Sequence, residues 1–327
     1  MRFIVYGAGA IGAVIGGLLH WNGHEVVLIA RGEHARALRE RGLSLESHAG
    51  IARLELPVVE HPREVELRES DAVLLTMKTQ DTAAALDDLV ACAPPDLAIA
   101  CAQNGVENER LALRRFARVQ GVSVMCPALF LEPGVVQAFG SPAPGILDVG
   151  RHPAGSDALS QQLSAAFRAA GFASRVCPDI SRFKHGKLLF NLGNAIEAAC
   201  GPAARKGQIA DLVRAEALAC FRAAGVEFDA EGAAARAQTN TPKPLGASAR
   251  PGGSSWQSLQ RGTGRIETDY LNGEIVLLGR SAGVPTPANA LLQRLSNELA
   301  RQRRPPGALS QDALLAMLDA PPASSAS

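Results

Sequence analysis

The chain has 327 residues, of which 47% are hydrophobic and 20% are charged, the proportions of an ordinary globular protein. Thirty-three basic residues against 32 acidic ones leave a formal net charge of +1, and this balance argues against a nucleic-acid partner. No stretch approaches the roughly 20 consecutive apolar residues that span a bilayer, and a strand-like run starts at residue 2. Six cysteines lie far apart, without a Cys-x-x-Cys pair or clustered histidines. We therefore expect a cytoplasmic protein with no membrane contact, reduced cysteines and no metal site.

The first half of the chain alternates strand and helix patterns. Apolar runs predict strands at residues 2–6, 25–30, 71–76 and 97–101, separated by helical patterns at 10–21, 33–41 and 83–89. Such an order is typical of a parallel sheet covered on both faces. A strand pair at 43–46 and 51–57 is expected on its flank. Further strands are expected at 121–130, 145–149 and 173–176, with a helix over 158–170.

From residue 180 onward helical patterns dominate, at 180–200, 209–224, 264–282 and 286–303. A loop at 239–255 carries three prolines and a Gly-Gly pair, which predicts a long connection. We therefore predict an α/β fold: an N-terminal Rossmann-type dinucleotide-binding domain over 1–178 and a C-terminal all-helical domain over 179–320. The small polar residues 321–327 are expected to be a disordered tail.

A Gly-x-Gly-x-x-Gly motif follows the first predicted strand and begins the first predicted helix. In this motif Gly7 allows a tight turn, Gly9 lets the backbone approach a pyrophosphate, and Gly12 lets the helix pack on the sheet. The first helical turn, with Ala10 and Ile11, would direct free N–H groups at the phosphates. The alternative is a structural glycine turn, but the position between strand and helix favours dinucleotide binding.

Arg31 stands after the second strand, where a protein that binds NAD usually has an acidic residue for the ribose 2′-hydroxyl. An arginine there suits the 2′-phosphate of NADP. Two alternatives are that Arg31 is simply solvated, or that Glu33 reaches back to the ribose. We expect NADPH/NADP+ as the cofactor.

Two predicted strands end in polar residues at the same edge of the sheet. Lys78 follows the strand at 71–76, and Asn104, within Gln103-Asn104-Gly105, follows the strand at 97–101. Open α/β sheets bind ligands at this carboxyl edge, although either residue alone would also suit a turn.

Only five of the 33 basic residues are lysine, and two of these fall in one apolar helical stretch. Lys184, Lys187, Asn191 and Asn194 are spaced so that they share one helical face. A solvated stripe is the alternative interpretation. Burial lowers the pKa of a lysine toward neutrality, so a lysine on this face is a candidate general acid. Further along, Ser255 and Glu267 are candidate site residues, although Glu267 and Asp269 would also suit an exposed first helical turn.

Together these features resemble the ketopantoate reductases (2-dehydropantoate 2-reductases). The matching residues, in the family's order, are Gly7-x-Gly9-x-x-Gly12, Arg31, Lys78, Asn104-Gly105, Lys187-Leu188-Leu189-Phe190-Asn191, Ser255, residues 266–273 and Val284-Pro285-Thr286-Pro287. The resemblance implies NADPH-dependent reduction of a 2-oxo acid to a 2-hydroxy acid, here 2-dehydropantoate to pantoate in pantothenate and coenzyme A biosynthesis.

The resemblance also implies roles for single residues. Lys187 would protonate the ketone oxygen as hydride arrives, and Glu267 would orient the substrate. Asn191, Asn194 and Ser255 would bind the substrate. Asn104 would contact both substrate and cofactor, and Lys78 would line the cofactor edge.

Two departures lie on the substrate side. Where the family has a second asparagine eight residues after the catalytic lysine this chain has Ala195, with Asn194 one position earlier, and Trp256 follows the serine. A different small 2-oxo acid is therefore an alternative substrate. A non-catalytic NADP-binding sensor is the alternative class, but such a protein would not need Lys187 and Glu267. The sequence leaves the oligomeric state open, with a homodimer as one option.

Overall fold

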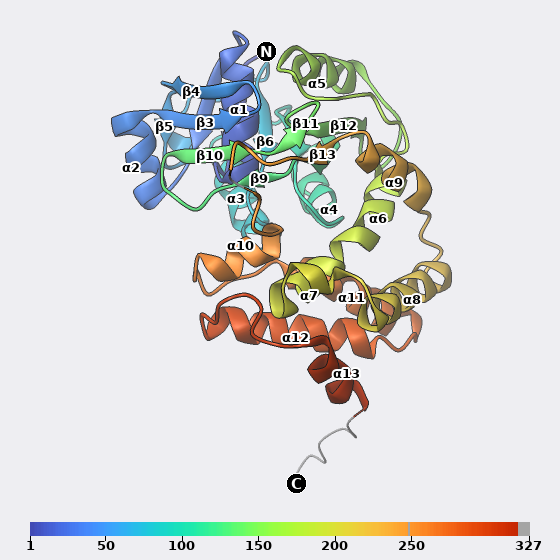
Figure 1. Ribbon diagram of the computed structural model, residues 1–327. Coiled ribbons are helices and arrows are strands. Elements are labelled where there is room, and N and C mark those ends of the chain that lie inside the picture. Colours follow the sequence, from blue (N-terminus) through green and yellow to red (C-terminus); the bar gives the residue numbers. More distant parts are fainter. Residues whose placement is uncertain (248, 320–327) are drawn as a thin grey trace. The chain divides into compact units, whose positions relative to one another are not determined.

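The computed structural model describes residues 1–247 and 249–319 and divides the chain into two units (Figure 1). Unit 1 comprises Met1–Lys187 and Phe228–Arg250, and unit 2 comprises Leu188–Glu227 and the chain from Pro251 onward. The domain ranges 1–178 and 179–320 stay a prediction. The predicted tail at 321–327 lies outside the described residues.

Unit 1 is built on a seven-stranded sheet in the order β12-β8-β7-β6-β1-β2-β5. Its strands are β1 (Phe3–Tyr6), β2 (Val26–Ile29), β5 (Val58–Val59), β6 (Ala72–Leu75), β7 (Ala98–Cys101), β8 (Val119–Met125) and β12 (Ile146–Arg151). All neighbouring strands are parallel except β12, which is antiparallel to β8. The predicted α/β sheet is confirmed, and its central strands are those expected from the apolar runs.

Helices and alternating side chains build a core on each face of this sheet. Phe3 and Val5 of β1 join the core formed with α1 (Ala10–Trp21) and α5 (Ala158–Ala169). Tyr6 belongs to the core on the opposite face, formed with α3 (Thr82–Val90) and α4 (Asn108–Leu113). Burial on both faces explains why these strands are apolar throughout. Helix α2 (Gly32–Arg41) adds Ala35 and Leu38 to the first of these two cores.

A second, four-stranded sheet has the order β4-β3-β10-β9. Its strands are β3 (Leu43–Ser47), β4 (Gly50–Leu54), β9 (Ala128–Leu129) and β10 (Val135–Ala138). Two strands expected from the sequence differ in the structure. The single strand predicted at 121–130 is wrong, because β8 ends at Met125 and β9 lies in the other sheet. Pro127 stands at the break and has no N–H to continue the ladder. The strand predicted at 173–176 is only two isolated bridges to β12.

Unit 2 is helical, and α7 packs against α8, α10 and α12. Its helices are α7 (Gly193–Cys200), α8 (Gln208–Ala223), α10 (Ser254–Gln260), α11 (Asn272–Ala282), α12 (Pro287–Arg301) and α13 (Gln311–Asp319). The helix predicted at 264–282 starts only at Asn272, after a short 3-10 turn at Thr268–Tyr270. A helix could not begin at Gly264, because this residue has a left-handed φ of +79°.

The helix expected at 180–200 is two helices, α6 (Ile180–Asn191) and α7, separated by Leu192. Asn194 therefore lies on α7 and not on the same helix as Lys187, which corrects the expected single stripe. Gly193 follows the break, in keeping with the low helix propensity of asparagine and glycine. The division between the units falls inside α6, after Lys187.

Candidate active site

The glycine loop between β1 and α1 has close backbone and side-chain contacts at Gly7 and Gly12. Gly7 has a φ of +102°, and a Cβ there would lie 2.6 Å from the Met77 backbone nitrogen. A Cβ on Gly12 would lie 2.5 Å from the Gly7 carbonyl oxygen and from Thr76 Oγ1. Larger side chains at either position would push the loop off the sheet.

Gly9 differs, because the space beside it is open. Among the described residues, a Cβ on Gly9 would meet only the Gly7 carbonyl oxygen, at 4.0 Å. Gly9 at the N-cap gives α1 no side-chain cap, and the first turn of the helix carries no acidic residue, so no side chain of this turn competes for the N–H groups of Ala10 and Ile11. An open cradle at an uncapped helix N-terminus fits a dinucleotide pyrophosphate.

The segments after β6 and β7 are joined by side-chain hydrogen bonds. Gln103 donates from Nε2 to the Met77 carbonyl oxygen at 2.9 Å and to Thr82 Oγ1 at 2.8 Å. Asn108 donates from Nδ2 to Thr79 Oγ1 at 3.1 Å and to the Asn104 carbonyl oxygen at 3.0 Å. These bonds fix the backbone of both segments at the carboxyl edge of the sheet.

Two lysines one helical turn apart on α6 bind the same segment after β7. Lys187 donates from Nζ to Asn104 Oδ1 at 2.5 Å. Lys184 is buried, donates to the Gln103 carbonyl oxygen at 3.1 Å, and forms an ion pair with Glu109, which is buried as well. The structure therefore brings Lys187 and Asn104 together, and it shows that Lys184 is not part of a solvated stripe.

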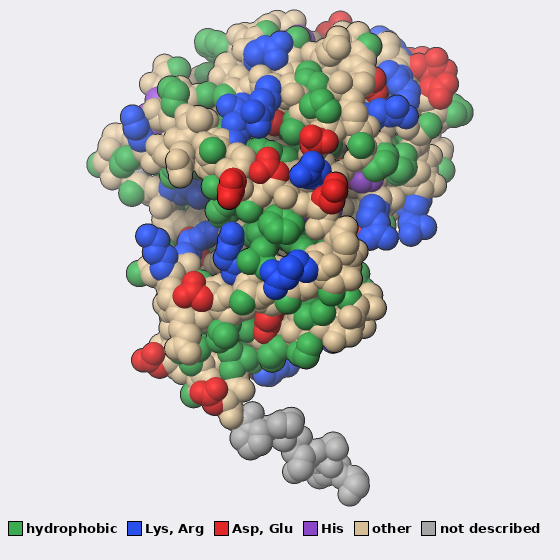
Figure 2. All heavy atoms as spheres, turned by 90° about the vertical axis from the view of Figure 1, so that its right-hand side faces the viewer, with side chains coloured by type: hydrophobic (Ala, Val, Ile, Leu, Met, Phe, Trp, Pro, Cys, Tyr) green, Lys and Arg blue, Asp and Glu red, His purple; other side chains and the backbone are tan. Residues whose placement is uncertain are grey.

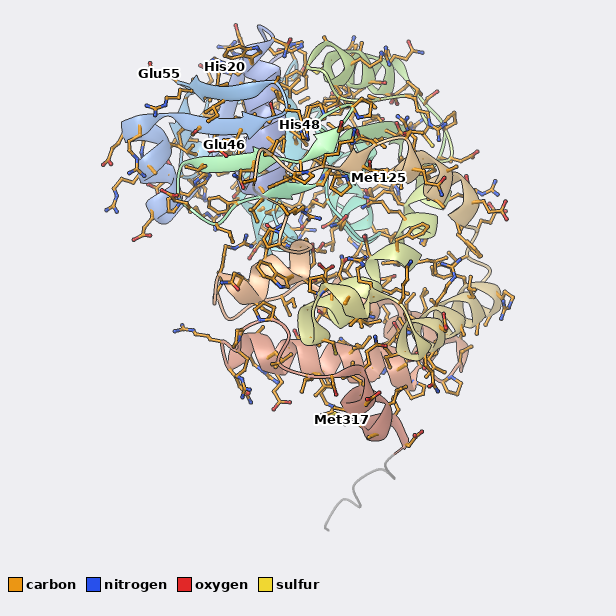
Figure 3. The ribbon with its side chains drawn as sticks, in the orientation of Figure 1. His20, Glu46, His48, Glu55, Met125 and Met317 are labelled. Carbon is orange, nitrogen blue, oxygen red and sulfur yellow. The ribbon has the colours of Figure 1, made fainter. Side chains whose placement is uncertain are left out.

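The start of α6 is anchored to the sheet by an apolar cluster of Met125, Cys177, Ile180, Phe183 and Ala233. Met125, at the end of β8, is labelled in Figure 3. This packing fixes α6 next to the strands whose ends carry the polar segments.

Arg31 is exposed and lies in a group of polar side chains that the sequence did not reveal. Its Nη2 donates to the Tyr6 hydroxyl at 3.2 Å and lies 3.6 Å from Asp88 Oδ2. The Tyr6 hydroxyl donates to the same Asp88 oxygen at 3.0 Å. Burial, and then the hydrogen bond to Asp88, raise the pKa of Tyr6 to about 12, so its phenol stays protonated at neutral pH.

In unit 2, the side chains of Asn194 and Glu197 on α7 both accept hydrogen bonds from the guanidinium group of Arg205. Arg205 donates from Nη1 to Asn194 Oδ1 at 3.0 Å and to Glu197 Oε2 at 2.5 Å. The other oxygen of the buried Glu197 carboxylate accepts the Gly253 N–H at 2.7 Å. Arg205 and Glu197 were not among the expected site residues, since no local pattern links them.

The remaining expected residues of unit 2 differ in burial. Ser255 is buried near the start of α10, and its Oγ has no hydrogen-bond partner among the described residues. Glu267 is also buried, whereas Asp269 is exposed and accepts hydrogen bonds from Gln293 and Asn297. The interpretation of Glu267 as an exposed acid is therefore wrong. Asn191 is half-buried at the end of α6.

The cysteines, the possible metal ligands, the surface charge and the hydropathy of the helices complete the description. The six cysteines are free, and burial raises the pKa of the Cys101 and Cys126 thiols, to about 12 for Cys126. The described residues contain no group of three or more His, Cys, Asp or Glu side chains suited to a metal ion. Basic and acidic side chains are interspersed on the face drawn in Figure 2. In the described chain, no helix has the length and hydropathy of a membrane span.

The parallel sheet and the open glycine loop define a Rossmann-type dinucleotide-binding protein. Comparison with protein families identifies the particular family. The family model of ketopantoate reductase PanE/ApbA matches residues 3–153, and the model of the C-terminal part of the same family matches residues 179–300. The chain belongs to this family of oxidoreductases, whose members bind a nicotinamide dinucleotide.

Individual relatives agree with this assignment. The chain is 29% identical to a 2-dehydropantoate 2-reductase of Pyrococcus horikoshii over 306 residues, which are 90% of this chain and 96% of that protein. A PanE/ApbA family ketopantoate reductase structure from Ralstonia eutropha has a TM-score of 0.77 at 27% identity, covering 93% of this chain and all of the other. D-mandelate dehydrogenase with NADH and anilino(oxo)acetate has a TM-score of 0.79 at 24% identity, over 93% and 99% of the two chains, which shows the shared fold.

Proposed function

We propose that this protein reduces a 2-oxo acid to a 2-hydroxy acid with NADPH, and that 2-dehydropantoate is its substrate. The observation that carries the proposal is the hydrogen bond between Lys187 and Asn104 at the carboxyl edge of the sheet. The glycine loop, Lys78 and Asn104 follow β1, β6 and β7, three neighbouring strands of that sheet. An ammonium group is thus held on the same sheet edge as the open phosphate cradle.

Unit 1 would hold the cofactor. The backbone N–H groups after Gly9, at Ala10 and Ile11, would bind the pyrophosphate, and Arg31 would pair with the 2′-phosphate. Lys78 and Asn104 would line the nicotinamide side. Bound NADPH would supply a hydride to the carbonyl carbon of the substrate.

Lys187 would act as the general acid. Its ammonium group would give a proton to the ketone oxygen, so that one hydride and one proton together convert the carbonyl into a hydroxyl group. Before that transfer the same cation would stabilise the negative charge that develops on the oxygen. Asn104 would keep the ammonium group pointing in one direction through its Oδ1.

Unit 2 would bind the acid. Arg205 donates to Oδ1 of Asn194 and so sets the orientation of this amide group, whose N–H donors would bind a substrate oxygen. Ser255 Oγ, buried without a partner among the described residues, is a second candidate donor. Asn191 would add an amide, and the buried Glu267 would orient the hydroxyl groups.

A second candidate is the same reaction on a different small 2-oxo acid. Ala195, buried on α7, offers no hydrogen bond where the family commonly has an asparagine. In addition, Trp256 lies so close to Gly252 that a Cβ there would be 2.4 Å from the Trp256 ring. Both differences concern the proposed acid side.

The test is a rate measurement. Purified protein is mixed with NADPH and, in turn, ketopantoate, pyruvate and phenylglyoxylate, and the loss of NADPH absorbance is followed. We expect the highest kcat/KM with ketopantoate. A higher value with another acid would favour the second candidate. Binding of NADPH without turnover of any acid would contradict an enzymatic function and favour a cofactor sensor.

A further inference from the structure

Four side chains from separate segments of unit 1 meet around the carboxylate of Asp88. Tyr6 ends β1, Arg31 follows β2, His61 follows β5, and Asp88 lies on α3. The Asp88 carboxylate accepts the Tyr6 hydroxyl at 3.0 Å, lies 3.6 Å from Arg31 Nη2, and is 3.3 Å from His61 Nε2. No other member of the group carries a negative charge at neutral pH.

The Asp88 carboxylate contacts one buried side chain, Tyr6, and one exposed side chain, Arg31. Tyr6 is a buried core residue, so its hydroxyl has a fixed position. The Arg31 side chain is 64% exposed, and an exposed ion pair of this kind contributes little stability. Arg31 is therefore free to turn toward a ligand, whereas Asp88 stays bound to Tyr6.

We infer that Asp88 is a specificity-determining residue that reduces the preference of this protein for NADPH over NADH. The inference rests on the proposed function, in which Arg31 pairs with the 2′-phosphate. A 2′-phosphate bound to Arg31 would carry nearly two negative charges close to the fixed Asp88 carboxylate, and like charges repel. The 2′-hydroxyl group of NADH is neutral and is not repelled. Asp88 also competes with the phosphate for the same guanidinium group.

Two side chains of opposite charge would thus act on the 2′ position. Arg31 supplies the cation that attracts the 2′-phosphate of NADPH, and Asp88, 57 positions later, supplies a negative charge that opposes this attraction. The protein accordingly accepts NADH as well as NADPH, with a smaller difference between them than Arg31 alone would produce.

The experiment is a calorimetric titration of the purified full-length protein with NADPH and with NADH, without substrate. The variant is Asp88→Asn, and the matched control is Asp87→Asn, since Asp87 is the neighbouring aspartate on α3, is 66% exposed, and pairs with Arg115 instead. We expect Asp88→Asn to lower the Kd of NADPH about three- to tenfold and to change that of NADH less than about twofold. Asp87→Asn should change neither.

Tyr6→Phe is a second variant, which keeps the buried ring and removes the hydroxyl that holds Asp88. It should shift the ratio of the two Kd values in the same direction by a smaller factor. Weaker NADPH binding by Asp88→Asn, or equal shifts for both dinucleotides, would overturn the inference while leaving the proposed function intact. Failure of the unmodified protein to bind either dinucleotide would overturn both.

Discussion

The two units hold their candidate site residues by different means. In unit 1 the glycine loop and the segments of Lys78 and Asn104 stand at the ends of paired strands, so the backbone ladder sets their places. In unit 2 the orientation of Asn194 and the start of α10 depend on contacts of two side chains, Arg205 and Glu197. Backbone hydrogen bonds of the sheet thus position the proposed cofactor site, whereas the proposed acid site depends on a few side-chain contacts that a single substitution can remove.

The largest expected effect separates catalysis from cofactor binding within unit 1. Lys187→Ala should lower kcat about 10²- to 10⁴-fold because the proton donor is lost, while the Kd of NADPH stays the same. Steady-state rates and a dinucleotide titration measure the two quantities. The exposed Lys243, replaced by alanine, is the control. Unchanged turnover in Lys187→Ala would refute its role as general acid.

The next largest effect is on the stability of unit 1. Lys184→Met should lower the free energy of unfolding by about 3–5 kcal/mol, because it leaves the buried Glu109 carboxylate without its partner. The double variant Lys184→Met/Glu109→Leu removes both charges and should recover most of the loss. Urea denaturation measures both. A single-variant loss below about 1 kcal/mol would mean that the pair is not buried as described.

A smaller effect is expected on cofactor choice. Arg31→Asp should weaken NADPH binding by about 2 kcal/mol, or roughly 30-fold, through loss of a charge-assisted contact, and should weaken NADH binding much less. Arg36, exposed on α2, is the control when replaced by aspartate. Equal losses for both dinucleotides would contradict the assignment of Arg31 to the 2′-phosphate.

The smallest effect concerns unit 2 and tests the comparison directly. Arg205→Ala should lower the free energy of unfolding by about 1–2 kcal/mol, since Arg205 is only partly buried, and should raise the KM for the acid about tenfold as Asn194 loses its orientation. The Kd of NADPH should not change. Arg214→Ala, an exposed position on α8, is the control. A raised Kd of NADPH with an unchanged KM would reverse the proposed roles of the units.

Features encoded by neighbouring residues were predictable from the sequence. The glycine loop is one local motif, and the strands before Lys78 and Asn104 are short apolar runs, so their place at one edge of a parallel sheet could be predicted. The hydrogen bond between Lys187 and Asn104 joins two residues that had each been expected at the site for separate reasons.

Long-range side-chain pairs were not predictable. Glu109 lies 75 positions from Lys184, and Asp88 lies 82 positions from Tyr6, and neither pair leaves a periodic signal. The break at Leu192 was missed as well, because an apolar helical pattern continues through it. Long-range pairs were thus missed in unit 1, with Glu109 and Asp88, as well as in unit 2, with Arg205 and Glu197.

The most direct test of the central claim follows the hydride itself. NADPH carrying deuterium at C4 of the nicotinamide, on the transferred face, is mixed with ketopantoate and the protein, and the product is examined by mass spectrometry and NMR. We predict pantoate with the deuterium bound to C2 in the presence of the unmodified protein, and almost none with Lys187→Ala. Unlabelled pantoate, or no pantoate with a protein that binds NADPH tightly, would contradict the account.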